Sequence, residues 1–255
     1  MMKCQLALIA ILLIFNLTFQ TAVPQDAEPK TIRVLIVDDH SPGYYNMPTA
    51  ITIRNILRAD KRFEVVLIED AEILGTDIPF DYDVIFLQFK NRRIPKRNEA
   101  MQKNLEKFVT EGGGLFIYHF ACGAFEDWSG FEQLAGRVWE PAKPPHDPYG
   151  LFSVQIADKT HPITRNLDNF EIRDELYTCL KDSDVPIRIL AEAVSKVDGK
   201  TYPMAFVLDN DKGKGDKGRV FHTTLGHNDQ SLSSVPFQTM MKNALVWCAK
   251  RDAVQ

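Results

Sequence analysis

The stretch "GGGLFIYHFACGAFEDW" (Gly112–Trp128) joins an apolar run to a more polar segment with helical spacing. A short, continuous run such as "GLFIYHF" is typical of a strand buried on both faces of a parallel sheet. The turn after this strand carries a histidine and a cysteine, His119 and Cys122. Three interpretations are open for this turn: a nucleophile elbow, a metal site, or packing at the end of a strand.

The sequence before this stretch repeats the same alternation of apolar runs and amphipathic segments. Strands are expected over 31–39, 63–70, 80–89 and 114–120, and helices over 49–60, 97–114 and 124–136. Strands separated by helices or long crossovers predict an open α/β sheet that is mostly parallel.

The second half of the chain is less regular. Further strands are expected over 151–158, 171–179, 187–194, 202–209 and 218–226, with a helical turn over 161–167, a surface loop over 210–219 and a closing helix over 235–252. No repeat or linker interrupts this pattern, so a single domain over residues 31–251 is expected.

Residues 1–27 differ from the rest. One early lysine, Lys3, precedes an apolar run from Leu6 to Phe19, which is too short for a comfortable membrane span. This segment predicts a secretory signal peptide or an uncleaved N-terminal anchor, and therefore an exported protein, periplasmic or extracellular.

Composition excludes some functions. A net charge of −4 provides no basic surface for nucleic acid. Outside the N-terminal segment the cysteines are Cys122, Cys179 and Cys248, and an odd number with wide spacing is not a disulfide framework.

Polar residues placed directly after strands are the best candidates for a site, because ligands of open α/β sheets bind outside the carboxyl ends of the strands. These residues are Asp38, Asp39, His40, His119, Asp174, Glu175 and His227. We expect His119, His227 and His40 to be metal ligands, with Zn²⁺ favoured by the donor types. Glu175, His227 and Asp174 are the expected catalytic acids and bases.

Other residues are expected at the margin of this site. His40 and His146, the latter in the proline-rich loop "KPPHDPYG", are predicted to bind substrate. Phe125 and Trp128 could form an apolar wall on which a sugar stacks. Core packing is the alternative for both aromatic residues. His161 and His222 are expected to be structural, the first at a helix start and the second in the core.

Cys122 supports a competing hypothesis, a cysteine hydrolase or amidotransferase with His227 and Asp229 as partners. A nucleophile elbow needs small residues two positions to either side of the nucleophile, because its turn is tight. Phe120 occupies one of these positions, which argues against the hypothesis.

The segments "RVLIVDDH", "DYDVIFLQF", "FVTEGGGLFIYHFACGAFEDWSGFEQLAGRVW", "HDPYGLFSV", "HPITRNLDNFEIRDELYT" and "GRVFHTTLGH" together resemble the trehalose-utilisation (ThuA-like) family over most of the chain. The resemblance implies a flavodoxin-like three-layer sandwich of the class I glutamine amidotransferase type, with extra strands in the C-terminal half. It also implies that the glutaminase triad is absent and that some members bind a metal.

The resemblance assigns functional positions to His40, His119, Glu175 and His227, and it implies metabolism of trehalose-like disaccharides beside sugar dehydrogenases that form 3-keto sugars. We therefore expect an exported enzyme that processes a glycoside or keto-disaccharide, by isomerisation, elimination or cleavage. A non-catalytic carbohydrate-binding protein is the alternative. A sugar dehydrogenase is the expected pathway partner, and a homo-oligomeric state stays open.

Overall fold

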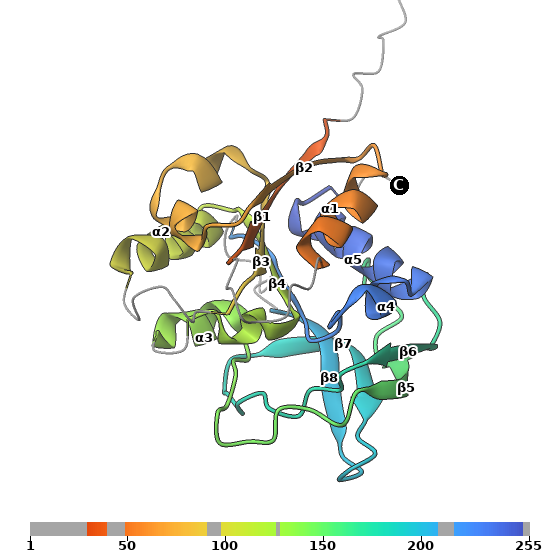
Figure 1. The fold of residues 1–255 in the computed structure, drawn as a ribbon. Helices are drawn as coiled ribbons and strands as arrows, with labels where there is room; N and C mark the ends of the chain where they lie inside the picture. Colours follow the sequence, from red (N-terminus) through yellow and green to blue (C-terminus); the bar gives the residue numbers. More distant parts are fainter. Residues whose placement is uncertain (1–29, 40–48, 91–97, 126–127, 209–216, 252–255) are drawn as a thin grey trace, which may run out of the picture.

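The computed structural model describes residues 30–39, 49–90, 98–125, 128–208 and 217–251 of the 255-residue chain (Figure 1). The predicted signal or anchor over residues 1–27, most of the predicted surface loop over 210–219, and His40 lie outside the described residues. Within the described residues, no helix is both long and apolar enough to cross a membrane.

The first half forms the parallel part of the sheet. Strand β1 pairs in parallel with β2 and β3, and β3 pairs in parallel with β4. The elements are β1 (Ile32–Asp38), α1 (Thr49–Arg58), β2 (Phe63–Ile68), η1 (Ala71–Gly75), η2 (Ile78–Asp81), β3 (Val84–Gln88), α2 (Glu99–Thr110) and β4 (Gly114–Tyr118). Every residue of β3 and β4 is buried, as expected for central strands covered on both faces.

The second half adds antiparallel strands to the same sheet. Its elements are η3 (His119–Gly123), α3 (Ser129–Ala135), β5 (Gly150–Ile156), β6 (Phe170–Asp174), β7 (Ile187–Val194), β8 (Thr201–Leu208), β9 (Val220–Thr223), α4 (Asp229–Leu232) and α5 (Val235–Cys248). Strand β9 returns to pair in parallel with β4, and β8, β7, β5 and β6 follow it antiparallel. The strand order is β2-β1-β3-β4-β9-β8-β7-β5-β6.

Alternate residues of the central strands supply two separate cores. On one face, Val34, Phe86 and Phe116 pack with residues of α1 and α5. On the other face, Leu35 and Ile85 pack with residues of α2 and α3. Figure 1 shows these helix pairs on opposite sides of the sheet. The arrangement confirms the predicted three-layer α/β sandwich with a parallel centre and additional C-terminal strands.

Several predicted strands are shorter than their apolar patterns. The strand expected over 80–89 begins only at Val84, because Ile78–Asp81 forms η2. The strand expected over 171–179 ends at Asp174, because the Asp174 carboxylate accepts the backbone N–H of Glu175 and the chain leaves the ladder there. The strand expected over 218–226 ends at Thr223. The residues that follow Asp174 and Thr223 are therefore not part of these strands and can contribute to a site.

Candidate metal centre

His119 is held in an unusual backbone conformation at the end of β4. Its φ of 50° is left-handed, a conformation that costs a residue other than glycine roughly 1–3 kcal/mol. It is the first residue of η3, so the strand-to-helix elbow turns on His119 and not on Cys122. The side chain is buried, and its Nδ1 lies 2.6 Å from the backbone oxygen of Thr224, just after β9.

This contact determines which nitrogen of His119 is available. A carbonyl oxygen only accepts hydrogen bonds, so Nδ1 carries the proton and donates it to Thr224. In the neutral imidazole, Nε2 therefore holds the lone pair. Metal-binding histidines typically have this arrangement, in which a backbone carbonyl orients the ring through the other nitrogen.

Asp174 holds together the segments that carry Glu175 and His227. Its fully buried carboxylate accepts three backbone N–H groups: those of Glu175 at 2.8 Å and His227 at 3.0 Å on Oδ1, and that of Gly226 at 2.7 Å on Oδ2. Hydrogen bonds to a charged group are stronger than neutral ones, so this carboxylate fixes the two segments relative to each other.

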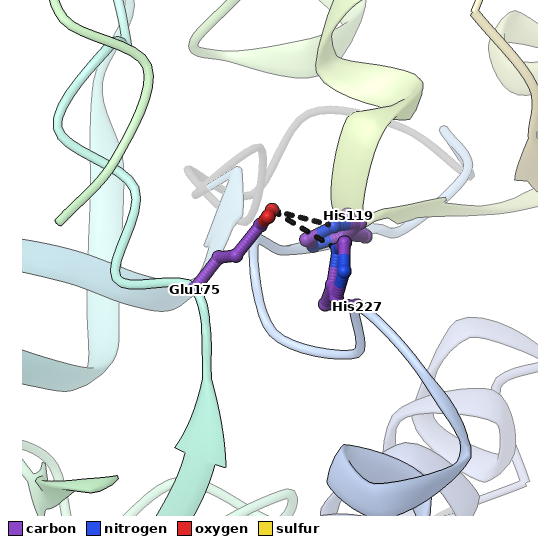
Figure 2. Close-up of side chains that lie close together, drawn as sticks. All are labelled: His119, Glu175 and His227. Atoms are coloured by element: carbon purple, nitrogen blue, oxygen red, sulfur yellow. Dashed lines mark ion pairs between the residues drawn. The ribbon is translucent and has the colours of Figure 1, made fainter. Parts of the chain in front are cut away.

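The three side chains from these segments point toward one another, as Figure 2 shows. Glu175 Oε2 lies 3.1 Å from His227 Nδ1 and 3.5 Å from His119 Nε2. One ligand atom from each of the three residues lies within 4.8 Å of the other two. The cluster forms at the carboxyl ends of β4 and β9, where they meet the chain that leaves β6.

The electrostatics favour an ionised carboxylate. Burial alone would raise the pKa of Glu175, but the imidazoles of His119 and His227 beside it outweigh burial and hold this pKa well below its usual range. The pKa of His227 is raised by its hydrogen bond to Glu175, which outweighs partial burial. Without a metal, the pair therefore behaves as an imidazolium and a carboxylate at mildly acidic pH.

The donor set fits a divalent transition metal. Two imidazole nitrogens and one carboxylate oxygen are the three protein ligands typical of catalytic zinc, which keeps another position open. Two ligand atoms about 2.1 Å from a tetrahedral ion are about 3.4 Å apart. The observed separations of 3.1 and 3.5 Å match that spacing. His119, Glu175 and His227 could thus hold a metal ion.

His146 reaches the other oxygen of the same carboxylate. Its Nε2 lies 3.3 Å from Glu175 Oε1, and its Nδ1 lies 2.6 Å from the backbone oxygen of Asp147. An isolated antiparallel bridge to Tyr177 places it there. The His146 side chain is 29% exposed, whereas that of His119 is 2% exposed, so His146 faces the open side of the cluster.

The structure thus gathers His119, Glu175, His227 and His146, with Asp174 behind them. Asp174 accepts three backbone N–H groups, which supports a positioning role, and its expected part in proton transfer stays a prediction. Phe125 and Trp128 pack against each other and against Phe131 in the core beside α3. They are not brought to the histidine cluster, and their stacking with a sugar stays a prediction.

The remaining histidines are structural, as expected. His222 is fully buried in β9 with its Nδ1 on the backbone oxygen of Ala135, and burial lowers its pKa to about 4. His161 Nδ1 accepts the backbone N–H of Ile163 at 3.3 Å and so caps the turn that it begins.

Cys122 lacks the properties of a nucleophile. It is fully buried, and burial raises the pKa of its thiol far above the usual range. A reactive cysteine needs exposure and a lowered pKa, because the thiolate is the nucleophile. Cys122 packs with Tyr177 and Cys179, and the structure therefore provides no support for the hydrolase alternative.

Sequence reasoning did not identify two tyrosines beside the cluster. Tyr177 places its hydroxyl 3.2 Å from His119 Nε2, and the ring of Tyr149 lies 5.5 Å from that of His227. The Tyr149 hydroxyl also donates toward the side-chain oxygens of Asn228 and Gln230. Tyr177 lies two residues after Glu175 in a segment that resembled a strand, and no spacing signal distinguished it from a core residue.

Comparisons with solved structures confirm the fold. A ThuA-like protein from Parabacteroides merdae superposes with a TM-score of 0.74 and 22% identity, over 89% of this chain and 92% of that one. A ThuA-like protein from Bacteroides uniformis gives 0.67 and 17%, over 87% and 93%. A glutamine amidotransferase from Thermotoga maritima gives 0.53 and 9%, over 87% and 100%. At these identities the likeness extends to the fold alone.

A search of curated protein sequences returned no match. The sequence itself matches the ThuA family model, described as trehalose utilisation, over residues 33–248, which include every residue of the His119–Glu175–His227 cluster. The chain belongs to the ThuA family, whose role is in trehalose utilisation.

Proposed function

We propose that this protein is a metal-dependent enzyme that processes a trehalose-type glycoside or its keto derivative. One observation carries the proposal: the Nε2 lone pair of His119, the Nδ1 of His227 and the Oε2 of Glu175 converge, with the His119 ring fixed by Thr224. A protein that only hydrogen-bonds sugar hydroxyls has no need for a preorganised set of three metal ligands. A bound divalent ion would supply Lewis acidity toward a sugar carbonyl or hydroxyl oxygen.

The residues of the chain would divide the remaining work. Oε2 of Glu175 faces His119 and His227, and its Oε1 faces His146. Because His146 is partly exposed and beside this carboxylate, it is placed to give or take a proton at a sugar oxygen bound there. Asp174, held by three backbone N–H groups, keeps the Glu175 and His227 segments in register.

The experiment compares turnover with simple binding. The zinc-loaded protein is incubated with trehalose and with 3-keto-trehalose prepared by a sugar dehydrogenase, and products are followed by NMR. We expect conversion of one of these sugars and a loss of roughly 100-fold or more in His146→Ala, the range of general acid–base catalysis. His161→Gln is the control, since His161 packs against Trp247 away from the cluster.

Calorimetric binding of either sugar without any product would contradict the enzymatic proposal. That result would identify a carbohydrate-binding protein with the same cluster.

We also propose that the protein is exported, because an apolar segment from Leu6 to Phe19 follows Lys3. Expression of the full chain followed by intact-mass analysis of secreted and membrane fractions tests this. Recovery of the uncleaved chain from the cytoplasm alone would refute it.

A further inference from the structure

The Tyr177 hydroxyl lies against the atom that a metal would need. It is 3.2 Å from His119 Nε2, and the two rings are 4.7 Å apart. The tyrosine is buried, and its ring also stacks on that of His146 at 6.0 Å with 21° between the planes. Tyr177 therefore contacts both a candidate metal ligand and the candidate proton carrier.

The direction of this hydrogen bond follows from the far side of the His119 ring. Nδ1 donates to the Thr224 carbonyl oxygen, so the neutral imidazole presents only a lone pair at Nε2. The Tyr177 hydroxyl is then the donor to Nε2. In the metal-free protein, this hydroxyl occupies the lone pair with which His119 would bind an ion.

A metal and the Tyr177 proton cannot share that lone pair. When an ion binds His119, the hydroxyl loses its acceptor, and a buried hydroxyl without a partner is costly. It must turn to another acceptor beside the ion. The Glu175 carboxylate lies between His119 and His146, but its Oε2 would bind the ion and its Oε1 already faces His146. The acceptor that remains for the Tyr177 hydroxyl is an oxygen of a sugar bound beside the ion.

We propose that Tyr177 is a catalytic hydrogen-bond donor that switches from His119 Nε2 to the sugar oxygen when the metal binds. This inference rests on the proposed function, and it assigns to the sugar an oxygen that gains negative charge during the reaction. A donor preorganised in a site that excludes water stabilises such charge effectively.

The ring and the hydroxyl of Tyr177 have separable tasks. The ring packs in a small cluster with Cys122 and Cys179, and Trp139 lies against it. Tyr177→Phe keeps this packing and removes only the donor. Tyr202→Phe is a matched control, because its hydroxyl bonds the exposed carboxylate of Asp198, away from the cluster.

The test has one readout without turnover and one with it. Zinc is added to the metal-free protein while the tyrosine absorption band is recorded, and kcat on 3-keto-trehalose is then measured. We expect a zinc-induced tyrosine difference signal in the wild type and in Tyr202→Phe, and a clearly smaller one in Tyr177→Phe, where Tyr149 still lies beside His227. We also expect Tyr177→Phe to keep one equivalent of zinc and to lose roughly 100-fold in kcat, as for removal of a single oxyanion donor.

Two outcomes would overturn the proposal. An equal difference signal in Tyr177→Phe would show that the hydroxyl does not change partner, and an unchanged kcat would show that it does not act in the reaction. Failure of the proposed function would look different, since the wild type itself would then bind no zinc or turn over neither sugar.

Discussion

Replacing Asp174 by asparagine tests how the site is assembled. The aspartate carboxylate accepts backbone N–H groups at both oxygens, two on Oδ1 and one, from Gly226, on Oδ2. An asparagine keeps one oxygen, which can still serve Glu175 and His227. Its amide nitrogen then faces the N–H of Gly226, so that two donors oppose each other in a buried position.

The magnitude follows from these contacts. Leaving the buried Gly226 N–H unsatisfied costs about 1–3 kcal/mol, and the loss of charge from the other two hydrogen bonds adds about 1 kcal/mol. We therefore expect Asp174→Asn to lower the free energy of unfolding by about 3 kcal/mol. Because the Glu175 and His227 segments are no longer fixed together, zinc affinity should fall roughly 10- to 100-fold, as for other residues that orient metal ligands.

The assay is urea unfolding of the metal-free protein, with zinc affinity measured by competition against a chromophoric chelator. Asp168→Asn is the matched control, since Asp168 is exposed and pairs on the surface with Lys159. It should change stability by less than about 1 kcal/mol. The positioning role would be refuted if the free energy of unfolding of Asp174→Asn lay within 0.5 kcal/mol of the wild-type value (about the effect of an ordinary surface substitution) and its zinc affinity were unchanged.

Three further predictions concern the surroundings of the site. Gly226 has a φ of 114°, and a Cβ there would lie 1.9 Å from the Tyr118 hydroxyl. Gly226→Ala should therefore lower the free energy of unfolding in urea by roughly 3 kcal/mol or more. A decrease below 1 kcal/mol (about one hydrogen bond) would be inconsistent with this packing. Buried Cys122 should resist iodoacetamide in the native protein and react after unfolding, which mass spectrometry of the labelled peptide would show. Rapid labelling of the native protein would instead support Cys122 as a nucleophile. His222 has its pKa lowered by burial to about 4, so the unfolded chain binds its proton first as the pH falls. The contribution of His222 to the free energy of unfolding should therefore be fully present above pH 6.5 and decrease by about 3 kcal/mol toward pH 4. His222→Gln should reduce this decrease when unfolding is measured as a function of pH. The same pH dependence in both proteins would contradict the prediction.

The layered fold was predictable because its signals are local. The apolar run of β4 identifies a buried strand, and the amphipathic spacing of α2 identifies a covering helix. The rule that polar residues after strands share one edge of the sheet correctly brought His119, Glu175 and His227 together.

Other features of the site depend on contacts between distant segments, which no periodicity records. The left-handed backbone of His119 is a conformation that sequence does not reveal for a residue other than glycine, so the sequence alone leaves Cys122 as a candidate for the elbow. His146 reaches Glu175 only because its loop forms an isolated bridge with Tyr177. The carboxylate of Asp174 was expected to be reactive, and its three backbone partners appear only in the folded chain.

We propose that His119, Glu175 and His227 form one metal site. Zinc content and affinity of the purified protein, of His119→Ala and of His227→Ala, with His161→Gln as the control, test it most directly. We expect about one equivalent of zinc in the wild type and in the control. Each ligand variant should lose at least about 100-fold in zinc affinity, since one of three protein ligands is removed. Zinc bound equally by all four proteins, or by none of them, would contradict it.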